Sequence, residues 1–390
     1  MRLFHVVLND YRPDKRVHKA ACLAVSQGYE VTVLATNRSN FQSRHEYVDG
    51  VEVIRLGGFL SLPWSNVFKI FNIVFFMFFV KKMFVKKKPD IVHIHDLSGL
   101  VASFFILKKA KKIVYDAHEY FSQDYLALSM PIPLAYAAHF IHNILAARAN
   151  VIITVGDMIA DRLRSDIKGA ENKVYVVRNV PDLDTVTASE VVVKNFFSAI
   201  EDPYIFIHVG RTENGRQFDK LIDALKEADD NICLLFLGAS LALQDLVNSK
   251  AKEFISRVAC IDPVPSNEVY SIVKQAHCGL VWFDGSCENF RLAMPNKIFD
   301  YLSANIPVLV NDLPGMSTFI NNTSTGVVFS SDGHDLSVKM NSMLDLKPFE
   351  VDLLRSNVSL QATKCNWNVE SMILKDIYKE LGGSFEFDKK

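Results

Sequence analysis

The feature that most constrains the fold is the regular alternation of short apolar runs with helical patterns along the chain. Runs that suit buried strands occur at 3–8, 31–35, 51–56, 91–95, 113–115, 151–155, 174–177, 204–209, 233–237, 258–261, 279–283, 307–310 and 326–329. The first helical pattern extends to Gln27, and Gly28 is a natural residue just beyond a helix end. Alternation of strand and helix is typical of doubly wound parallel sheets, so each half of the chain is predicted to form one.

Length and composition fit two such domains. The chain has 390 residues, 49% hydrophobic and 22% charged, with a formal net charge of −1, which is enough to bury two cores. Residues 1–195 carry 25 Lys and Arg against 18 Asp and Glu, whereas the remainder carries 18 against 26. This asymmetry suggests that the halves face different partners, with a chance imbalance of solvated residues as the alternative.

Cysteine usage indicates a reducing compartment. The six cysteines fall in no paired or metal-like spacing, and several lie inside apolar runs. We interpret them as reduced core residues of a cytosolic protein. Residues 1–8 lead straight into a strand pattern, so no signal peptide is expected.

Polar clusters stand where strands of the N-terminal half end. Asp96 follows the run that ends in His95, and the cluster 116–120 follows the run 113–115. Open α/β sheets bind ligands at the carboxyl ends of their strands. His118 has acidic neighbours and can act as an acid, a base or a hydrogen-bond donor near neutral pH, although a lone histidine is more often structural. The polar loop 9–16 after the first strand lacks a glycine fingerprint, which argues against a dinucleotide held there.

Residues 66–88 differ in kind from the rest. Positions 71–80 are ten uncharged residues, five of them phenylalanine, and five lysines follow by position 88. A bilayer span needs about 20 apolar residues, so this run is too short to cross. A basic, aromatic helix fits an anionic membrane surface and would leave aromatic side chains exposed; the alternative is a core helix with a charged end. The apolar helical pattern at 131–147 either extends that surface or packs in the core.

The stretch 288–314 carries an anion-site pattern. We predict a polar loop, a helix whose first turn holds Pro295, and a buried strand at 307–310. Asn289, Asn296 and Lys297 then lie at a helix N-terminus, where free N–H groups and the helix dipole favour negative charge. The alternative is a capped helix with a solvated lysine.

The loop that follows the run 204–209 is a second candidate for phosphate binding. It opens with Gly210 and Arg211 and continues to Arg216. Guanidinium groups offer paired donors to phosphate oxygens. A solvated basic loop is the alternative.

Together these motifs resemble those of the family 4 glycosyltransferases, which are retaining nucleotide-sugar enzymes. The resemblance covers nearly the whole chain and rests on 114–119, on 208–211 with Arg216, on 295–301 running into 307–310, and on Trp367 before the last helix. It implies an α/β protein of the GT-B fold, with two doubly wound Rossmann-like domains facing a cleft and a C-terminal helix crossing back. The implied parts are an acceptor-binding domain (1–190), a donor-binding domain (200–365) and the returning helix (366–390).

The resemblance also assigns the donor side of the site. Arg211 and Arg216 resemble a basic pair that neutralises the donor pyrophosphate. Asp300 stands where the second glutamate of the E-x7-E motif usually holds the ribose, and Leu292 replaces the first glutamate. The implied donor-binding set is Gly210, Arg211, Arg216, Asn289, Pro295, Asn296, Lys297 and Asp300.

The catalytic and acceptor-side residues follow in the same way. His118 resembles a histidine that lies beside the donor sugar, and with Arg211 and Lys297 it forms the expected catalytic set. The loop 9–16 replaces the family's usual Gly-Gly turn. The implied acceptor-side residues are Asn9, Asp14, Arg16, His95, Asp96 and Glu119.

The expected function is transfer of a sugar from a nucleotide sugar to a lipid-linked or cell-surface glycan, as in bacterial polysaccharide, O-antigen or capsule assembly. We expect a cytoplasmic protein, peripheral on the inner face of the plasma membrane through 66–88, with no nucleic-acid partner. The only Asp-x-Asp triplet, 182–184, lies in the expected linker, so neither a divalent metal nor a further cofactor is expected. The alternatives are a nucleotide-sugar epimerase on the same scaffold and a non-catalytic binding protein.

Overall fold

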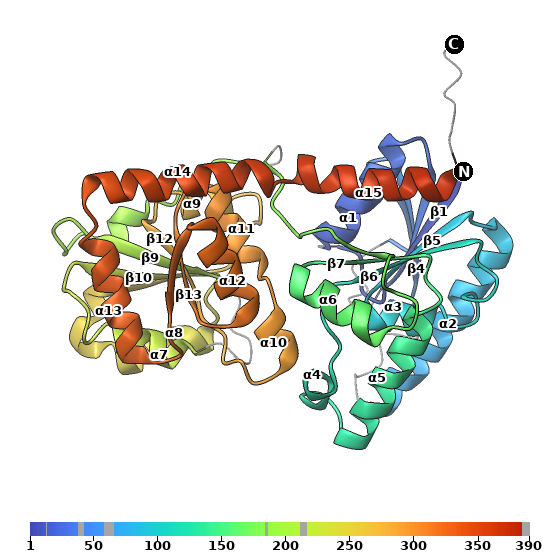
Figure 1. Ribbon diagram of the computed structural model, residues 1–390, viewed down its shortest axis with the longest axis horizontal. Coiled ribbons are helices and arrows are strands. Elements are labelled where there is room, and N and C mark those ends of the chain that lie inside the picture. Colours follow the sequence, from blue (N-terminus) through green and yellow to red (C-terminus); the bar gives the residue numbers. More distant parts are fainter. Residues whose placement is uncertain (13, 38–42, 58–65, 184–185, 211–216, 384–390) are drawn as a thin grey trace, which may run out of the picture. The chain divides into compact units, whose positions relative to one another are not determined.

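A computed structural model describes residues 1–12, 14–37, 43–57, 66–183, 186–210 and 217–383, with the backbone alone for 66–70 (Figure 1). The chain forms two compact units: Met1–Arg178 with Glu370–Lys390, and Asn179–Val369. The first unit ends before residue 190 because Val180 and Val193 already belong to the second core.

The first unit contains an eight-stranded sheet of order β3-β4-β2-β1-β5-β6-β7-β8. Its strands are β1 (Arg2–Val6), β2 (Glu30–Thr36), β3 (His45–Val48), β4 (Val51–Leu56), β5 (Ile91–His95), β6 (Lys112–Ala117), β7 (Val151–Thr154) and β8 (Val174–Val176). The pairing is parallel except for the β3–β4 pair, which is antiparallel. The edge strand β3 was not predicted because its side chains are exposed or half-buried and form no apolar run.

Helices connect the strands of this unit. They are α1 (Lys15–Ser26), α2 (Asn66–Lys87), α3 (Asp96–Ala102), α4 (Gln123–Ala127), α5 (Ile132–Ala146), α6 (Asp157–Asp166) and, from Glu370 onward, α15 (Trp367–Gly382). Arg16 was predicted in a loop but lies in the first turn of α1, where Asp14 is the N-cap and accepts a hydrogen bond from the Val17 N–H (3.1 Å). No helix in the described part of the chain combines the length and apolarity that a membrane span requires.

The C-terminal helix is tied into the first unit by buried contacts, as predicted for a returning helix. The Arg178 N–H donates to Glu370 Oε2 (2.8 Å). The Tyr29 hydroxyl donates to the carbonyl oxygen of Tyr378 (2.7 Å), and the Tyr378 hydroxyl lies 2.7 Å from His93 Nδ1. Residues far apart in sequence therefore complete one domain.

The second unit contains a six-stranded, parallel sheet of order β11-β10-β9-β12-β13-β14. Its strands are β9 (Tyr204–Val209), β10 (Ile232–Leu237), β11 (Val258–Ile261), β12 (Cys278–Val281), β13 (Val308–Asn311) and β14 (Gly326–Phe329). The helical segments are η2 (Val193–Phe197), α7 (Phe218–Ala224), α8 (Leu241–Lys250), η3 (Lys252–Arg257), α9 (Val269–Val273), α10 (Glu288–Leu292), α11 (Asn296–Ser303), α12 (Pro314–Thr323), α13 (Gly333–Leu344) and α14 (Pro348–Lys364). The run 326–329 forms an edge strand, as predicted.

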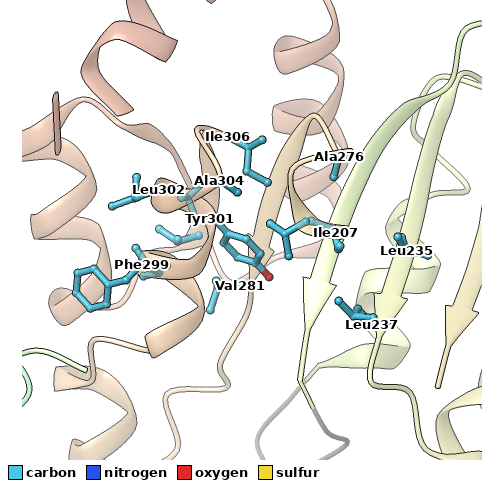
Figure 2. Close-up of a cluster of buried hydrophobic side chains, with 14 of the residues drawn as sticks. Ile207, Leu235, Leu237, Ala276, Val281, Phe299, Tyr301, Leu302, Ala304 and Ile306 are labelled. Atoms are coloured by element: carbon cyan, nitrogen blue, oxygen red, sulfur yellow. The ribbon is translucent and has the colours of Figure 1, made fainter. Parts of the chain in front are cut away.

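Tyr301 fixes α11 against the second sheet. Its ring lies among aliphatic side chains that include Ile207 and Val281 (Figure 2). Its hydroxyl accepts from the Val209 N–H (3.0 Å). A Cβ at Gly279 would lie 2.2 Å from the Tyr301 ring, so glycine in β12 allows the close approach of the helix.

The strand order reverses beside the first strand of each sheet, between β1 and β5 and between β9 and β12. In open α/β sheets, ligands bind at the carboxyl ends of strands next to such a reversal. Polar residues that follow β1, β5 and β9 are therefore placed where ligands are expected.

Candidate active site

Lys297 lies in the first turn of α11 and is buried, although lysine usually remains in water. Its Nζ is 3.2 Å from Nε2 of His208, on β9. The other ring nitrogen of His208, Nδ1, is 3.1 Å from the Leu280 carbonyl oxygen. A carbonyl oxygen only accepts, so Nδ1 carries the proton and the Nε2 lone pair accepts from the ammonium group. The imidazole thus holds the lysine in place without neutralising its charge.

Gly210 leaves room for this ammonium group at the end of β9. Its φ of +120° is a conformation that side chains rarely adopt, and an added Cβ would lie 3.4 Å from Lys297 Nζ. The predicted donor-binding residues Gly210 and Lys297 are therefore brought together.

The start of α11 adds backbone donors beside Lys297. Pro295 is the N-cap residue and makes no side-chain cap bond. The first N–H groups of a helix have no partner within the helix, and the dipole makes this end positive. A buried ammonium group and a helix N-terminus therefore lie within one turn of each other, which is an arrangement suited to phosphate.

The remaining predicted donor-binding residues differ in burial and in the element that carries them. Asn289 is buried, and it lies in the short helix α10 rather than in the predicted loop. Asn296 is exposed at the start of α11, and Asp300 is half-buried one turn later. Arg211, which also belongs to the expected catalytic set, and Arg216 lie outside the described residues.

In the first unit, Arg16 is paired with Asp116. Its Nε and Nη2 donate to the two carboxylate oxygens at 2.9 and 2.7 Å, and its Nη1 donates to the Val177 carbonyl oxygen (2.9 Å). Burial alone would raise the pKa of Asp116, but the charges of Arg16 and His118, together with hydrogen bonds from His118 and His95, outweigh it and hold the pKa well below its usual range. Arg16, predicted on the acceptor side, is engaged in a buried ion pair.

His118 lies between two carboxylates. Its Nδ1 is 3.1 Å from Asp96 Oδ2, and its Nε2 is 3.2 Å from Asp116 Oδ2. Burial lowers the pKa of His118, but the charges of Asp96 and Asp116 outweigh it and raise the pKa to about 10. With both nitrogens protonated, the ring is a cation at neutral pH. His118 was predicted to act as an acid, a base or a hydrogen-bond donor. A base needs a free lone pair on a ring nitrogen, which the doubly protonated ring does not have.

Asp96 and His95 have different environments. Asp96 begins α3 with φ +59°, a conformation that is uncommon outside glycine and that clusters at functional sites. It also accepts the His118 backbone N–H (3.1 Å). His95, predicted on the acceptor side, is fully buried, with Nδ1 3.3 Å from Asp116 and Nε2 2.9 Å from His5. His95 therefore contacts the buried Asp116 carboxylate, which in turn contacts His118.

The other acceptor-side residues shape local structure. Asn9 donates through Nδ2 to Asp14 (2.8 Å) and accepts the Tyr11 N–H (2.7 Å), which folds the loop before α1. Glu119 accepts a hydrogen bond from the Tyr125 hydroxyl. None of these bonds precludes contact with a ligand.

Sequence reasoning did not give a role to His208 or Asp116. Each interrupts an apolar strand: His208 is the only strongly polar residue in β9, and Asp116 is the only acidic residue in β6. A polar side chain in a buried strand requires a partner. The need for a partner could therefore have been inferred from the sequence. The partners themselves could not, because Lys297 and Arg16 are about 90 and 100 positions away.

Models of known protein families match segments of both units. Residues 16–185 match a model described as Glycosyltransferase Family 4, and residues 193–357 match one described as Glycosyl transferases group 1. A search of curated protein sequences found no match.

Solved structures resemble the chain over nearly its whole length. A sucrose-phosphate synthase from Thermosynechococcus elongatus has a TM-score of 0.80 at 14% identity, covering 98% of this chain and 99% of that one. A glycosyltransferase from Rickettsia africae has a TM-score of 0.71 at 13% identity, with coverages of 98% and 99%. Anabaena HepE in complex with UDP and glucose has a TM-score of 0.69 at 13% identity, with coverages of 97% and 100%. At such identities the likeness establishes the fold, which is GT-B.

Proposed function

We propose that this chain, a glycosyltransferase of the GT-B fold, moves a sugar from a nucleotide-diphosphate sugar to a lipid-linked or cell-surface glycan with retention of configuration. One observation carries the donor assignment: the buried Lys297 ammonium group is held by His208 at the N-terminal turn of α11, beside Gly210. The structures of the Anabaena protein with UDP-glucose, and with UDP and glucose, support the same donor class.

The donor chemistry requires positive charge where the leaving group forms. As the bond to the sugar breaks, negative charge grows on the nucleoside diphosphate. Donors aimed in advance at that charge stabilise the transition state more than the ground state. Lys297 and the first N–H groups of α11 supply such donors, and we propose that Arg211 and Arg216 add to them.

We assign His118 an electrostatic role rather than that of a base. It is a cation between Asp96 and Asp116, and its side chain retains 20% exposure. In this proposal its charged ring orients the donor sugar. The acceptor proton passes to the leaving phosphate, as the resemblance to retaining enzymes implies, so no protein base is required and no metal takes part in the step.

We further propose that the acceptor is reached at an anionic membrane surface. On α2, the exposed side chains include Phe71, Phe75 and Phe78, with exposures of 54%, 43% and 53%. Lys81 and Lys82 follow on the same helix and are exposed. Aromatic groups that enter the interface, next to lysines that meet anionic headgroups, are the pattern of a surface-lying helix.

A second helix of the same unit also exposes apolar side chains. On α5, Ile132, Tyr136, Phe140 and Ile144 recur every four residues and are 46–65% exposed. Both α2 and α5 contact α3. We propose that these exposed apolar side chains, gathered on two helices of one unit, belong to an interaction site.

Turnover of a panel of nucleotide sugars tests the donor assignment and separates the alternatives. A transferase releases nucleoside diphosphate when a glycan acceptor is present. An epimerase converts the donor without acceptor, and a binding protein turns over no donor. We expect acceptor-dependent release that falls at least about 100-fold in Lys297→Ala, while Lys274→Ala, elsewhere in the second unit, retains it. Acceptor-independent conversion or no turnover contradicts the proposal.

Vesicle co-sedimentation tests the membrane assignment. We expect the protein to sediment with vesicles rich in phosphatidylglycerol and to be released by salt. The triple change of Phe71, Phe75 and Phe78 to Ser should reduce binding. A matched control changes Phe349 and Leu353, exposed apolar residues of α14, to Ser. Equal binding by both variants contradicts the assignment to α2.

A further inference from the structure

Three side chains that can ligate a metal meet where α1 approaches the turn between β3 and β4. His18 and Cys22 lie four residues apart on one face of α1, and Asp49 lies in the turn. We propose that these three residues bind a Zn²⁺ ion through His18 Nε2, Cys22 Sγ and one carboxylate oxygen of Asp49.

The spacing of the ligand atoms fits one tetrahedral ion. His18 Nε2 is 3.1 Å from Asp49 Oδ2 and 3.6 Å from Cys22 Sγ, and the three ligand atoms lie within 4.8 Å of one another. Zinc bonds of about 2.0–2.3 Å at tetrahedral angles separate nitrogen from oxygen by roughly 3.4 Å and nitrogen from sulfur by roughly 3.6 Å. For the two pairs that involve His18 Nε2, the ion requires no more than a few tenths of an ångström of movement, and the sulfur and oxygen atoms, which lie within 4.8 Å, would settle at roughly 3.6 Å.

A buried tyrosine orients the histidine ring. The Tyr11 hydroxyl lies 2.7 Å from His18 Nδ1, and Tyr11 is itself buried, with its backbone N–H donating to Asn9 Oδ1. When the ion is bound, the imidazole proton sits on Nδ1 and donates to the Tyr11 hydroxyl oxygen, which leaves the Nε2 lone pair for zinc. Metal-ligating histidines usually have such a partner at the second nitrogen.

The turn that carries Asp49 is held against the helix. Asp49 and Gly50 both have positive φ, +50° and +78°. A Cβ at Gly50 would lie 2.9 Å from Cγ1 of Val25 on α1, so the turn packs directly on the helix that carries the other two ligands. The ligands are thus brought together by the fold before the ion arrives.

The ligand types select the metal. A thiolate, an imidazole and a carboxylate form a borderline-soft set that suits zinc, whereas Mg²⁺ and Ca²⁺ prefer oxygen ligands. The Cys22 thiol loses its proton to solvent as the Zn–S bond forms. His18 is 34% and Asp49 67% exposed, so water can reach a fourth coordination position. The ion would fasten α1, which also carries Arg16, to the β3–β4 turn.

Cysteine spacing alone did not predict this site. The six cysteines form no pair with metal-like spacing, and the partner of Cys22 on the helix is a histidine. None of the three ligands belongs to the proposed donor-binding set, so the inference is independent of the donor assignment.

Cobalt spectroscopy on the full chain tests the site. Co²⁺ bound to a thiolate has a charge-transfer band in the near ultraviolet. We expect one equivalent of Co²⁺ to give this band and Zn²⁺ to abolish it. Cys22→Ser should eliminate the band, while Cys260→Ser, a change at another half-buried cysteine, should retain it. Tyr11→Phe should weaken zinc affinity about tenfold.

Thermal unfolding gives a second readout. A ligand that binds only the native state raises the melting temperature. Zn²⁺ should therefore raise it for the wild type, and a chelator should reverse the rise. Cys22→Ser should retain donor turnover and show no zinc response. A cobalt band that persists in Cys22→Ser, or a wild type that shows neither the band nor a zinc response, overturns the proposal and leaves an ordinary polar contact between His18 and Asp49.

Discussion

The Lys297 ammonium group donates to the His208 imidazole across 3.2 Å, and the opposite ring nitrogen of His208 lies 3.1 Å from the Leu280 carbonyl oxygen. These two contacts connect Lys297 of α11 to the backbone of β12 through the His208 side chain of β9. The lysine charge is consequently fixed at the carboxyl end of β9, beside Gly210. A preorganised charge stabilises a leaving phosphate without the cost of reorienting a flexible side chain.

Changing His208 tests whether these contacts support donor binding. His208→Leu removes one acceptor of the Lys297 ammonium group, and a hydrogen bond to a charged group contributes about 1.5–3 kcal/mol. We expect nucleoside diphosphate affinity to fall about tenfold or more by isothermal titration calorimetry. His208→Gln, which can place an acceptor near the former Nε2, should restore part of the loss. Wild-type affinity in His208→Leu would show that Lys297 does not depend on this residue.

Gly279 is predicted to be intolerant of a side chain. In Gly279→Ala the new methyl group would meet the Tyr301 ring at 2.2 Å and push α11 away from β12. Overpacking of this kind costs typically 1–3 kcal/mol, measured as the free energy of unfolding in urea. The control is Gly333→Ala, because no atom lies within 4 Å of an added Cβ there. Equal stabilities would mean that α11 does not pack as closely as described.

Removing one partner of the buried pair of Arg16 and Asp116 should strongly destabilise the first unit. Arg16→Ala leaves the Asp116 carboxylate buried without its main partner, which costs about 3–5 kcal/mol. Lys226→Ala removes an exposed partner of Asp223 and should cost less than about 1 kcal/mol. Urea unfolding of both variants measures the difference, and similar losses would contradict a buried role for Arg16.

The His118 cluster predicts a pH dependence of stability. The pKa of His118 is raised from an ordinary value of 6.5 to about 10, so its contribution is complete below pH 6.5 and is lost as the pH rises through about 10. The pKa of Asp116 is depressed, so its contribution is lost only in acid. Between pH 7 and 10 the wild type should therefore lose more unfolding free energy than His118→Gln. Parallel profiles in that range would indicate a neutral His118.

Local pattern predicted the buried strands of both sheets because burial on both faces leaves largely apolar runs, whereas α3, α4 and α12 were not predicted. The run at 233–237 in β10, which contains no charged residue and is buried throughout, is an example. The exposed strand β3 has no such run, and the short helix α10 was taken for a loop because its five residues span little more than one turn.

The site was only partly predictable for a different reason. Lys297 and Gly210 could be identified separately, since each stands at an element boundary. His208, Asp116 and the role of Arg16 depend on contacts between residues about 90 and 100 positions apart. Hydrophobic periodicity reports which face of an element is buried, and it does not report which distant side chain meets a polar group on that face.

Titration of a panel of nucleoside diphosphates into the wild-type protein and Lys297→Ala, with heat as the readout, tests the central claim most directly. We expect that at least one diphosphate binds the wild type, that Lys297→Ala weakens its binding tenfold or more, and that Lys274→Ala binds it as the wild type does. Undiminished binding by a folded Lys297→Ala variant would contradict the placement of the donor phosphates at the start of α11.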